Sequence, residues 1–229
     1  MQSGYTKNEF LSIVDERILS VPIEESNEPL IDLKEQSVVL LGPSPEIPDN
    51  QDYTKMRNAV YDKLVEAQKK LPHGLRFRLY EGYRSLQLQQ KLFDDRYQLL
   101  KKKYSHWHHE QIFHETVKLI SPVVNLDGTH NVPPHSTGAA VDVYLIDDNE
   151  EIVDMGIPVA DWMQDVDGSF SKTDSSKISD LAKKNRAVMS TALIKVGFVN
   201  YPSEYWHWSY GDRYWAYHVG EKKARYGTV

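Results

Sequence analysis

Two short segments, about sixty residues apart in the sequence, must meet in space if their side chains are to act together, and this requirement constrains the fold most. The first runs from Pro134 to Asp142 and the second from Glu204 to His207. His135, Asp142 and His207 offer three nitrogen and oxygen ligands of the kind that bind Zn²⁺, which leaves a fourth position for water. Three protein ligands are typical of a catalytic zinc site, whereas four are typical of a structural one. The two segments therefore predict one zinc ion per chain.

The composition removes several other classes of protein. The 229 residues include no cysteine, so disulfides, thiolate catalysis and cysteine-based zinc fingers are excluded. A formal charge of -6 provides no basic face for nucleic acid. No stretch approaches the roughly 20 apolar residues that span a bilayer, and the N-terminus has no apolar run resembling a signal peptide. We expect a cytoplasmic protein without nucleic-acid or membrane partners; a periplasmic location is the alternative if an unrecognised route exports it. The oligomeric state does not follow from the composition.

The first 54 residues differ from the rest of the chain. They hold five of its 11 prolines around one apolar run, Val38–Leu41. Such a segment is typical of an arm that packs on a domain, so we predict an N-terminal arm at 1–54 and a single main domain at 55–229.

The main domain alternates between helical and strand-like patterns. Helical spacing of apolar residues predicts helices at 55–71, from the N-cap Ser85 to about residue 103, from there to 120, and at 178–196. Strands are predicted at 75–80, at 139–146 with a hairpin partner near 152, at 198–201 and at 205–210, and a surface loop at 161–177. Because most strands are linked by hairpins, the expected fold class is α+β, a single domain with a central antiparallel sheet flanked by helices.

The candidate ligands lie in contexts that suit a metal. Gly138 permits a turn or a close backbone approach just after His135. Asp142 lies inside an apolar strand, where an uncompensated carboxylate is costly and a cation offsets that cost. An alternating strand around His207 would put Tyr205 on the same face and Trp206 on the other.

Two further residues can complete a hydrolytic site. Glu204 precedes His207 by three positions, so a turn or bulge must bring the two together; it could then take a proton from a zinc-activated water. Arg84 follows the strand at 75–80 and offers a permanent cation for an oxyanion or a substrate carboxylate. A purely structural role for Arg84, as the partner of a carboxylate, is the alternative.

These motifs together resemble a known family. The pattern H-x-x-G-x-A-x-D at 135–142, the pattern E-x-W-H at 204–207 and the G-Y-R at 82–84 are similar to those of the D-alanyl-D-alanine dipeptidases, VanX-type enzymes of the zinc-dependent LAS (M15) peptidases. The resemblance covers roughly residues 55–218. It implies a LAS-peptidase-like fold, zinc held by His135, Asp142 and His207, Glu204 as general base, and Arg84 as the group that stabilises the transition state.

The resemblance also implies a substrate, a small D,D-dipeptide such as D-Ala-D-Ala with a free amine. Two positions differ from the family pattern. Pro133 stands where the family usually has a serine, and Asp161 follows Met155-Gly156 one residue later than the family's aspartate. The resemblance assigns the contact with the substrate amine to Asp161.

Other functions stay open on the sequence. A D,D-carboxypeptidase or cell-wall endopeptidase of the same group would act on longer peptides. A non-catalytic module that binds cell-wall glycan or peptide could use the many C-terminal aromatic rings, but it would not need Glu204 beside an open metal position. His106, Glu110 and His114 form a helical stripe that could imitate a second metal site; a solvated face is the simpler interpretation.

Overall fold

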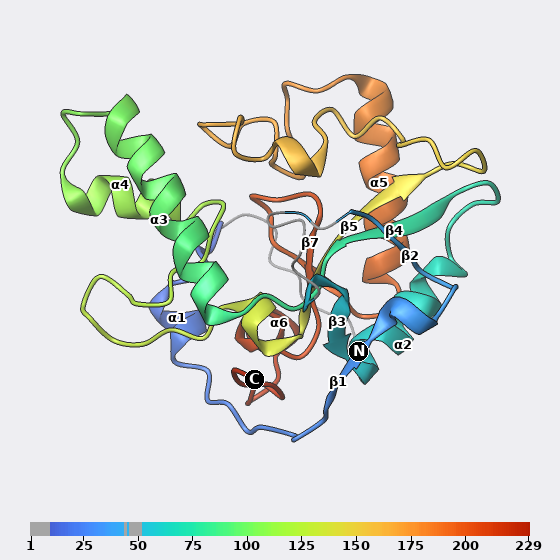
Figure 1. Ribbon diagram of the computed structural model, residues 1–229, viewed down its shortest axis with the longest axis horizontal. Helices are drawn as coiled ribbons and strands as arrows, with labels where there is room; N and C mark the ends of the chain where they lie inside the picture. Colours follow the sequence, from blue (N-terminus) through green and yellow to red (C-terminus); the bar gives the residue numbers. More distant parts are fainter. Residues whose placement is uncertain (1–9, 44, 46–51) are drawn as a thin grey trace.

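The main sheet occupies the centre of the computed structural model, which describes residues 10–43, 45 and 52–229 (Figure 1). Within these residues it has five strands in the order β2-β4-β5-β7-β6. They are β2 (Leu40–Leu41), β4 (Arg76–Glu81), β5 (Ala140–Ile146), β6 (Val199–Asn200) and β7 (His207–Ser209). All neighbours are antiparallel except β2 and β4, which are parallel. The predicted α+β class with a central antiparallel sheet is confirmed, and one parallel edge strand is added.

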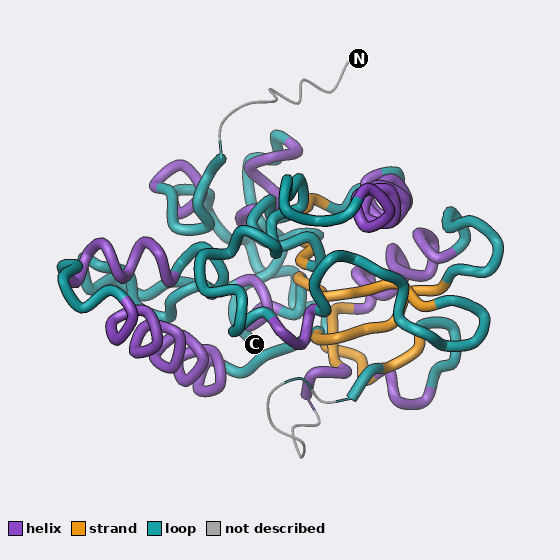
Figure 2. Tube along the Cα trace, turned by 90° about the horizontal axis from the view of Figure 1, so that it is seen from above, coloured by secondary structure: helices purple, strands orange, loops and turns teal. Residues whose placement is uncertain are grey.

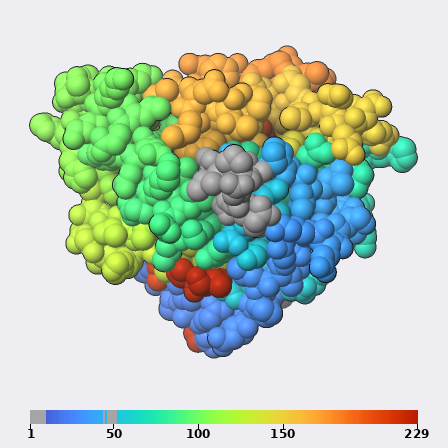
Figure 3. All heavy atoms as spheres, viewed as in Figure 1, coloured from blue at the N-terminus to red at the C-terminus, as the bar shows by residue number. Residues whose placement is uncertain are grey.

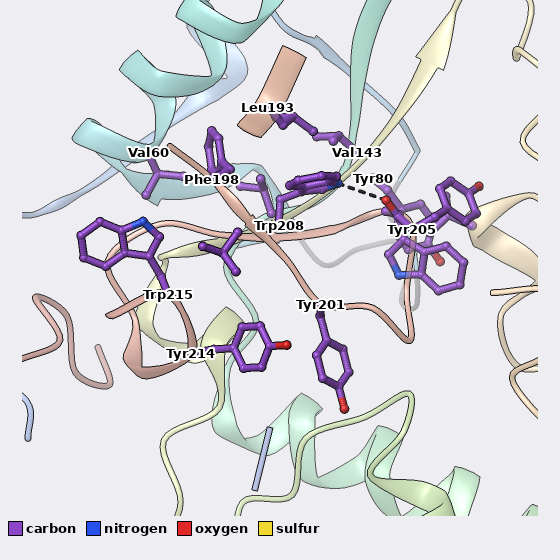
Figure 4. Packing of buried hydrophobic residues seen from close by; sticks show 14 of the residues in the cluster. Val60, Tyr80, Val143, Leu193, Phe198, Tyr201, Tyr205, Trp208, Tyr214 and Trp215 are labelled. Atoms are coloured by element: carbon purple, nitrogen blue, oxygen red, sulfur yellow. Dashed lines mark hydrogen bonds between the residues drawn. The ribbon is translucent and has the colours of Figure 1, made fainter. Parts of the chain in front are cut away.

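One face of the sheet carries the hydrophobic core. Helices α2 (Asn58–Gln68) and α5 (Asp180–Ile194) contact each other behind the sheet. Figure 4 shows Leu193 of α5 close to Val143 and Trp208, whose side chains point from β5 and β7 toward the helices. The indole Nε1 of Trp208 donates to the carbonyl oxygen of Tyr205 at 3.1 Å (Figure 4). Because side chains alternate along a strand, the neighbours Asp142 and His207 point to the opposite face.

Two helices extend from one side of the sheet. They are α3 (Leu86–Lys103) and α4 (His109–Thr116), which pack against each other away from the strands (Figure 2). In the space-filling view this pair (green) forms one side of the molecular face, and the segment near residues 150–190 (yellow to orange) forms its upper edge (Figure 3). Ser85 caps α3 as predicted, since its hydroxyl accepts from the Leu88 N–H at 3.2 Å. Among the described helices, none is long and apolar enough to cross a membrane.

The N-terminal segment is tied into the domain by strand pairing. Its elements are α1 (Glu16–Leu19), β1 (Leu30–Asp32), the 3₁₀ turn η1 (Leu33–Glu35) and β2. β1 pairs with β3 (Lys55–Arg57), and β2 forms the edge of the main sheet. The 3₁₀ turn η2 (Asp52–Thr54) precedes β3. The domain boundary placed after residue 54 stays a prediction.

Several sequence-based boundaries shift in the structure. The helix expected from residue 55 begins at Asn58, because 55–57 form β3 instead. The helix expected to end at 120 ends at Thr116, and the hairpin partner of β5 is a single bridge between Ile146 and Ile152. Helix α6 (Arg213–Val219) was not predicted. Its many aromatic residues leave no clear helical alternation of apolar and polar positions in the sequence. Asp212 caps the helix by accepting from the Trp215 N–H at 2.8 Å.

Candidate metal centre

Strand register brings the two sequence segments together. In the antiparallel pair β5–β7, Asp142 lies directly opposite His207. On the other side of β5, an irregularity in β4 between Leu79 and Glu81 places Glu81 opposite Asp142. Without this bulge Tyr80 would occupy that place, and Glu81 would face the other side of the sheet. Three polar residues therefore form a row across three adjacent strands.

His135 reaches the same point from a turn that precedes β5. It lies in the 3₁₀ turn η3 (Pro134–Thr137), which ends at Gly138 with φ of 71°. The positive φ strongly favours glycine at this position, and a side chain there would also have to displace a methyl group of Leu30. The Nδ1 of His135 lies 2.7 Å from the Gly82 carbonyl oxygen. Because a carbonyl only accepts, Nδ1 carries the proton and Nε2 is left to ligate.

The three ligand atoms form a triangle of the size that zinc requires. His135 Nε2 lies 3.1 Å from His207 Nδ1 and 3.3 Å from Asp142 Oδ1, and the last two atoms are 3.1 Å apart. For zinc bonds of about 2.0–2.1 Å in a tetrahedron, ligand atoms are separated by roughly 3.3–3.4 Å. All three residues are buried, and among the described residues they are the one such His, Asp and Glu cluster. The donor set and its spacing fit a zinc ion.

The electrostatics of the cluster also favour a cation. Burial alone would raise the pKa of the Asp142 carboxyl. The adjacent imidazoles of His135 and, to a smaller extent, His207 lower it by more, so the pKa lies well below its usual range. Burial opposes the charged form of His135, yet Asp142 raises its pKa overall. Burial lowers the pKa of His207. The site thus holds a carboxylate that stays charged in a buried environment and attracts positive charge, which a metal ion supplies in place of protons.

A tight turn resolves how Glu204 meets His207. The His207 N–H donates to the Glu204 carbonyl oxygen at 3.2 Å, which closes a β-turn over 204–207 just before β7. Glu204 is buried and lines the same pocket as the three ligands. Burial, and then the negative charge of Asp142, raise the pKa of its carboxyl well above the ordinary value. The structure thus brings Glu204 into one pocket with His135, Asp142 and His207.

The same turn corrects the prediction for the neighbouring rings. Trp206 was expected on the face away from His207, but it lines the pocket, and its Nε1 donates to Glu204 Oε2 at 3.0 Å. Tyr205 was expected beside His207 and instead lines a separate groove near Ile157. The prediction failed because residues 204–206 form a turn, where strand alternation does not apply.

Arg84 enters the pocket as a firmly held cation. Its guanidinium forms a double ion pair with Glu81, with Nε to Oε1 at 2.9 Å, and Nη1 donates to Gln89 Oε1 at 3.0 Å. Glu81 is fully buried, and Gln89 is in turn anchored to the Ser121 carbonyl oxygen at 2.6 Å. The positive charge of Arg84 also opposes the rise in the pKa of the Glu204 carboxyl. Both roles considered from the sequence, carboxylate partner and pocket cation, are compatible with this geometry.

Asn200 is a residue of the site that the sequence pattern did not reveal. Its side-chain amide donates to the carbonyl oxygens of Glu204 at 2.9 Å and His207 at 3.0 Å, and so spans the turn. Its own Oδ1 accepts from the Thr173 hydroxyl at 2.5 Å. An isolated asparagine at a strand end carries no sequence signal for such a role, since both contacts depend on the turn.

Asp161 lies elsewhere. It ends the 3₁₀ turn η4 (Val159–Asp161), accepts from the Gln164 amide at 2.8 Å, and lines a surface depression, whereas its neighbour Trp162 lines the metal pocket. The structure does not bring Asp161 together with the other predicted site residues, and its contact with a substrate amine stays a prediction. His106 precedes α4, and Glu110 and His114 are exposed on it.

Comparison with known proteins places this chain among the peptidases. The profile of peptidase family M15, described as D-ala-D-ala dipeptidase, matches residues 49–222. A D-alanyl-D-alanine dipeptidase of Synechocystis sp. is 27% identical over 92% of this chain and 96% of its own length. Among solved structures, the vancomycin resistance D,D-pentapeptidase VanY in complex with Zn(II) has a TM-score of 0.42 at 16% identity, covering 81% of this chain and 95% of its own. VanYB in complex with D-alanine-D-alanine has a TM-score of 0.44 at 17% identity, covering 88% and 93%.

Proposed function

The chain belongs to the peptidase M15 family of D-ala-D-ala dipeptidases, and from this membership we propose that it hydrolyses D-Ala-D-Ala or a closely related small D,D-dipeptide with one zinc ion per chain. His135, Asp142 and His207 would hold the ion. The observation that carries the proposal is the buried triangle of their ligand atoms, with sides of 3.1 to 3.3 Å, in one pocket with the carboxylate of Glu204. The cytoplasmic location expected from the sequence stays a prediction.

The chemistry divides between the ion and the protein. Zinc, when bound, polarises a peptide carbonyl and lowers the pKa of a water molecule. Glu204 would take the proton that the attacking water loses and deliver it to the nitrogen of the departing D-alanine as the C–N bond breaks. The Trp206 indole fixes the carboxylate through Oε2, which holds it in place for this transfer. Arg84 would stabilise the negative charge that develops on the carbonyl oxygen.

The decisive experiment measures metal content and D-alanine release together. We expect one zinc per chain, release of D-alanine from D-Ala-D-Ala, loss of activity on chelation and recovery on addition of Zn²⁺. N-acetyl-D-Ala-D-Ala should be cleaved far more slowly. Comparable cleavage of the blocked peptide would favour the carboxypeptidase alternative. A protein that binds no zinc, or binds it without cleaving any of these peptides, would contradict the proposal.

Removal of one ligand should abolish both metal binding and activity. His135→Ala leaves two protein ligands, so zinc is expected to be lost on dialysis and D-alanine release to fall to background. His130→Ala is the matched control, because His130 is exposed and does not line the pocket. Metal analysis by mass spectrometry checks the result. Retention of stoichiometric zinc by His135→Ala would show that His135 is not a ligand.

Asn200 should matter for the affinity of the site. Asn200→Ala removes two hydrogen bonds that hold the turn carrying Glu204 and His207, and we expect zinc affinity to fall by about 10- to 100-fold. A competitive chelator titration measures this. Asn125→Ala serves as control, because Asn125 holds a surface turn through Thr129 and does not line the pocket. Equal affinity in the two variants would argue against a role for Asn200.

A further inference from the structure

The N-terminal segment supplies part of the wall of the metal pocket. Ile13 lines that pocket together with Tyr201 and His207, and it is only 7% exposed. The Tyr201 ring contacts the His207 ring edge-on, with ring centroids 6.1 Å apart. The same Tyr201 ring lies 6.0 Å, between centroids, from the ring of Phe10 in the N-terminal segment. The Tyr201 ring therefore connects the N-terminal segment to His207, one of the three candidate metal ligands.

The position of Ile13 is held by contacts on its C-terminal side. Asp15 caps α1, accepting from the Arg17 N–H at 3.0 Å. Farther along, the Val21 carbonyl oxygen accepts from Arg213 Nε at 3.0 Å, and the Ala224 N–H donates to the Pro22 carbonyl at 2.9 Å. Because α1 also contacts α6, the segment is docked against the C-terminal part of the chain. Ile13 is a fixed wall of the pocket.

The pocket is narrow enough for one wall residue to matter. Its cavity volume is about 30 Å³, which accommodates one or two water molecules. A dipeptide is larger than this cavity, so a bound dipeptide must be in close contact with the side chains that line it. These include the apolar side chains of Val117, Leu119 and Ile120 beside Ile13. Contacts of this kind discriminate between substrates by size.

Ile13 comes from outside the part of the chain that matches the family profile, which begins at residue 49. We propose that Ile13 is a specificity-determining residue, which closes the substrate pocket beside Tyr201 and restricts this peptidase to small, unblocked dipeptides. The inference rests on the proposed function, and it assigns to the N-terminal segment a limit on substrate size that the metal ligands cannot impose.

The test compares two truncations in the same segment. Ile13→Ala enlarges the pocket, whereas Leu11→Ala removes an equally buried side chain, 6% exposed, that does not line it. We expect Ile13→Ala to shift the ratio of kcat/KM for N-acetyl-D-Ala-D-Ala over D-Ala-D-Ala by about 10- to 100-fold toward the blocked peptide. Leu11→Ala should leave the ratio unchanged. Zinc content should stay at the wild-type level in both.

Binding provides a second readout without turnover. In a Glu204→Gln background, calorimetric Kd values for the same two peptides should show the same shift on Ile13→Ala. If Ile13→Ala fails to fold, Ile13→Val should give a smaller shift of the same sign. A ratio that matches the Leu11→Ala control in a zinc-containing, active protein would overturn the inference. Absence of D-alanine release from the wild type would instead overturn the proposed function.

Discussion

Glu204→Gln is expected to reduce kcat for D-Ala-D-Ala by about 10²- to 10⁴-fold while the protein keeps its zinc. The amide preserves the shape of the side chain, and its oxygen can still accept from the Trp206 indole, so the turn should be maintained. It cannot, however, take up a proton. The expected loss is therefore in kcat, with little change in metal affinity or in the free energy of unfolding. Steady-state kinetics and metal analysis on one preparation measure both quantities.

The control for this variant is Glu115→Gln. Glu115 is also a largely buried carboxylate, and it pairs with Lys118 at 2.6 Å outside the metal pocket. Its replacement should leave kcat near the wild-type value. Full activity of Glu204→Gln would show that another group moves the proton. Loss of zinc from that variant would instead make Glu204 part of the metal-binding framework.

Arg84→Met is expected to damage both catalysis and stability. Loss of a preorganised donor to the oxyanion should reduce kcat by about 10²- to 10³-fold. The variant also leaves the fully buried carboxylate of Glu81 without its double ion pair, and breaking such a pair costs about 3–5 kcal/mol. Activity alone would therefore not distinguish a catalytic from a structural role.

A double variant separates the two roles. Glu81→Met with Arg84→Met removes both charges, so much of the lost free energy of unfolding should return, because an apolar pair often replaces a buried ion pair without a net cost. Activity should stay low if Arg84 acts on the substrate. Urea unfolding and kinetics on the single and double variants measure the two effects. Recovery of activity in the double variant would assign Arg84 a structural role only.

The elements that could be predicted are those specified by nearby residues. Helix α3 was located from Ser85 and the apolar spacing after it, and β5 from its continuous apolar run. The parallel pairing of β2 with β4 could not be predicted, because it joins segments almost forty residues apart through backbone hydrogen bonds that leave no mark on side-chain pattern. The faces assigned to Tyr205 and Trp206 were wrong for a related reason: a turn hydrogen bond replaced strand geometry there.

The chemistry of the site was predicted from its residues. Imidazole and carboxylate side chains, a glycine three residues after His135, and a carboxylate three residues before His207 are properties of local sequence, and they predict a metal and a hydrolytic reaction. The residues that surround the site were determined by tertiary packing. The bulge that places Glu81 beside Asp142, the Asn200 amide across the turn, and Ile13 against the pocket depend on contacts between residues distant in the chain. The local sequence pattern does not predict these contacts, because they form only when the sheet and the N-terminal segment pack together.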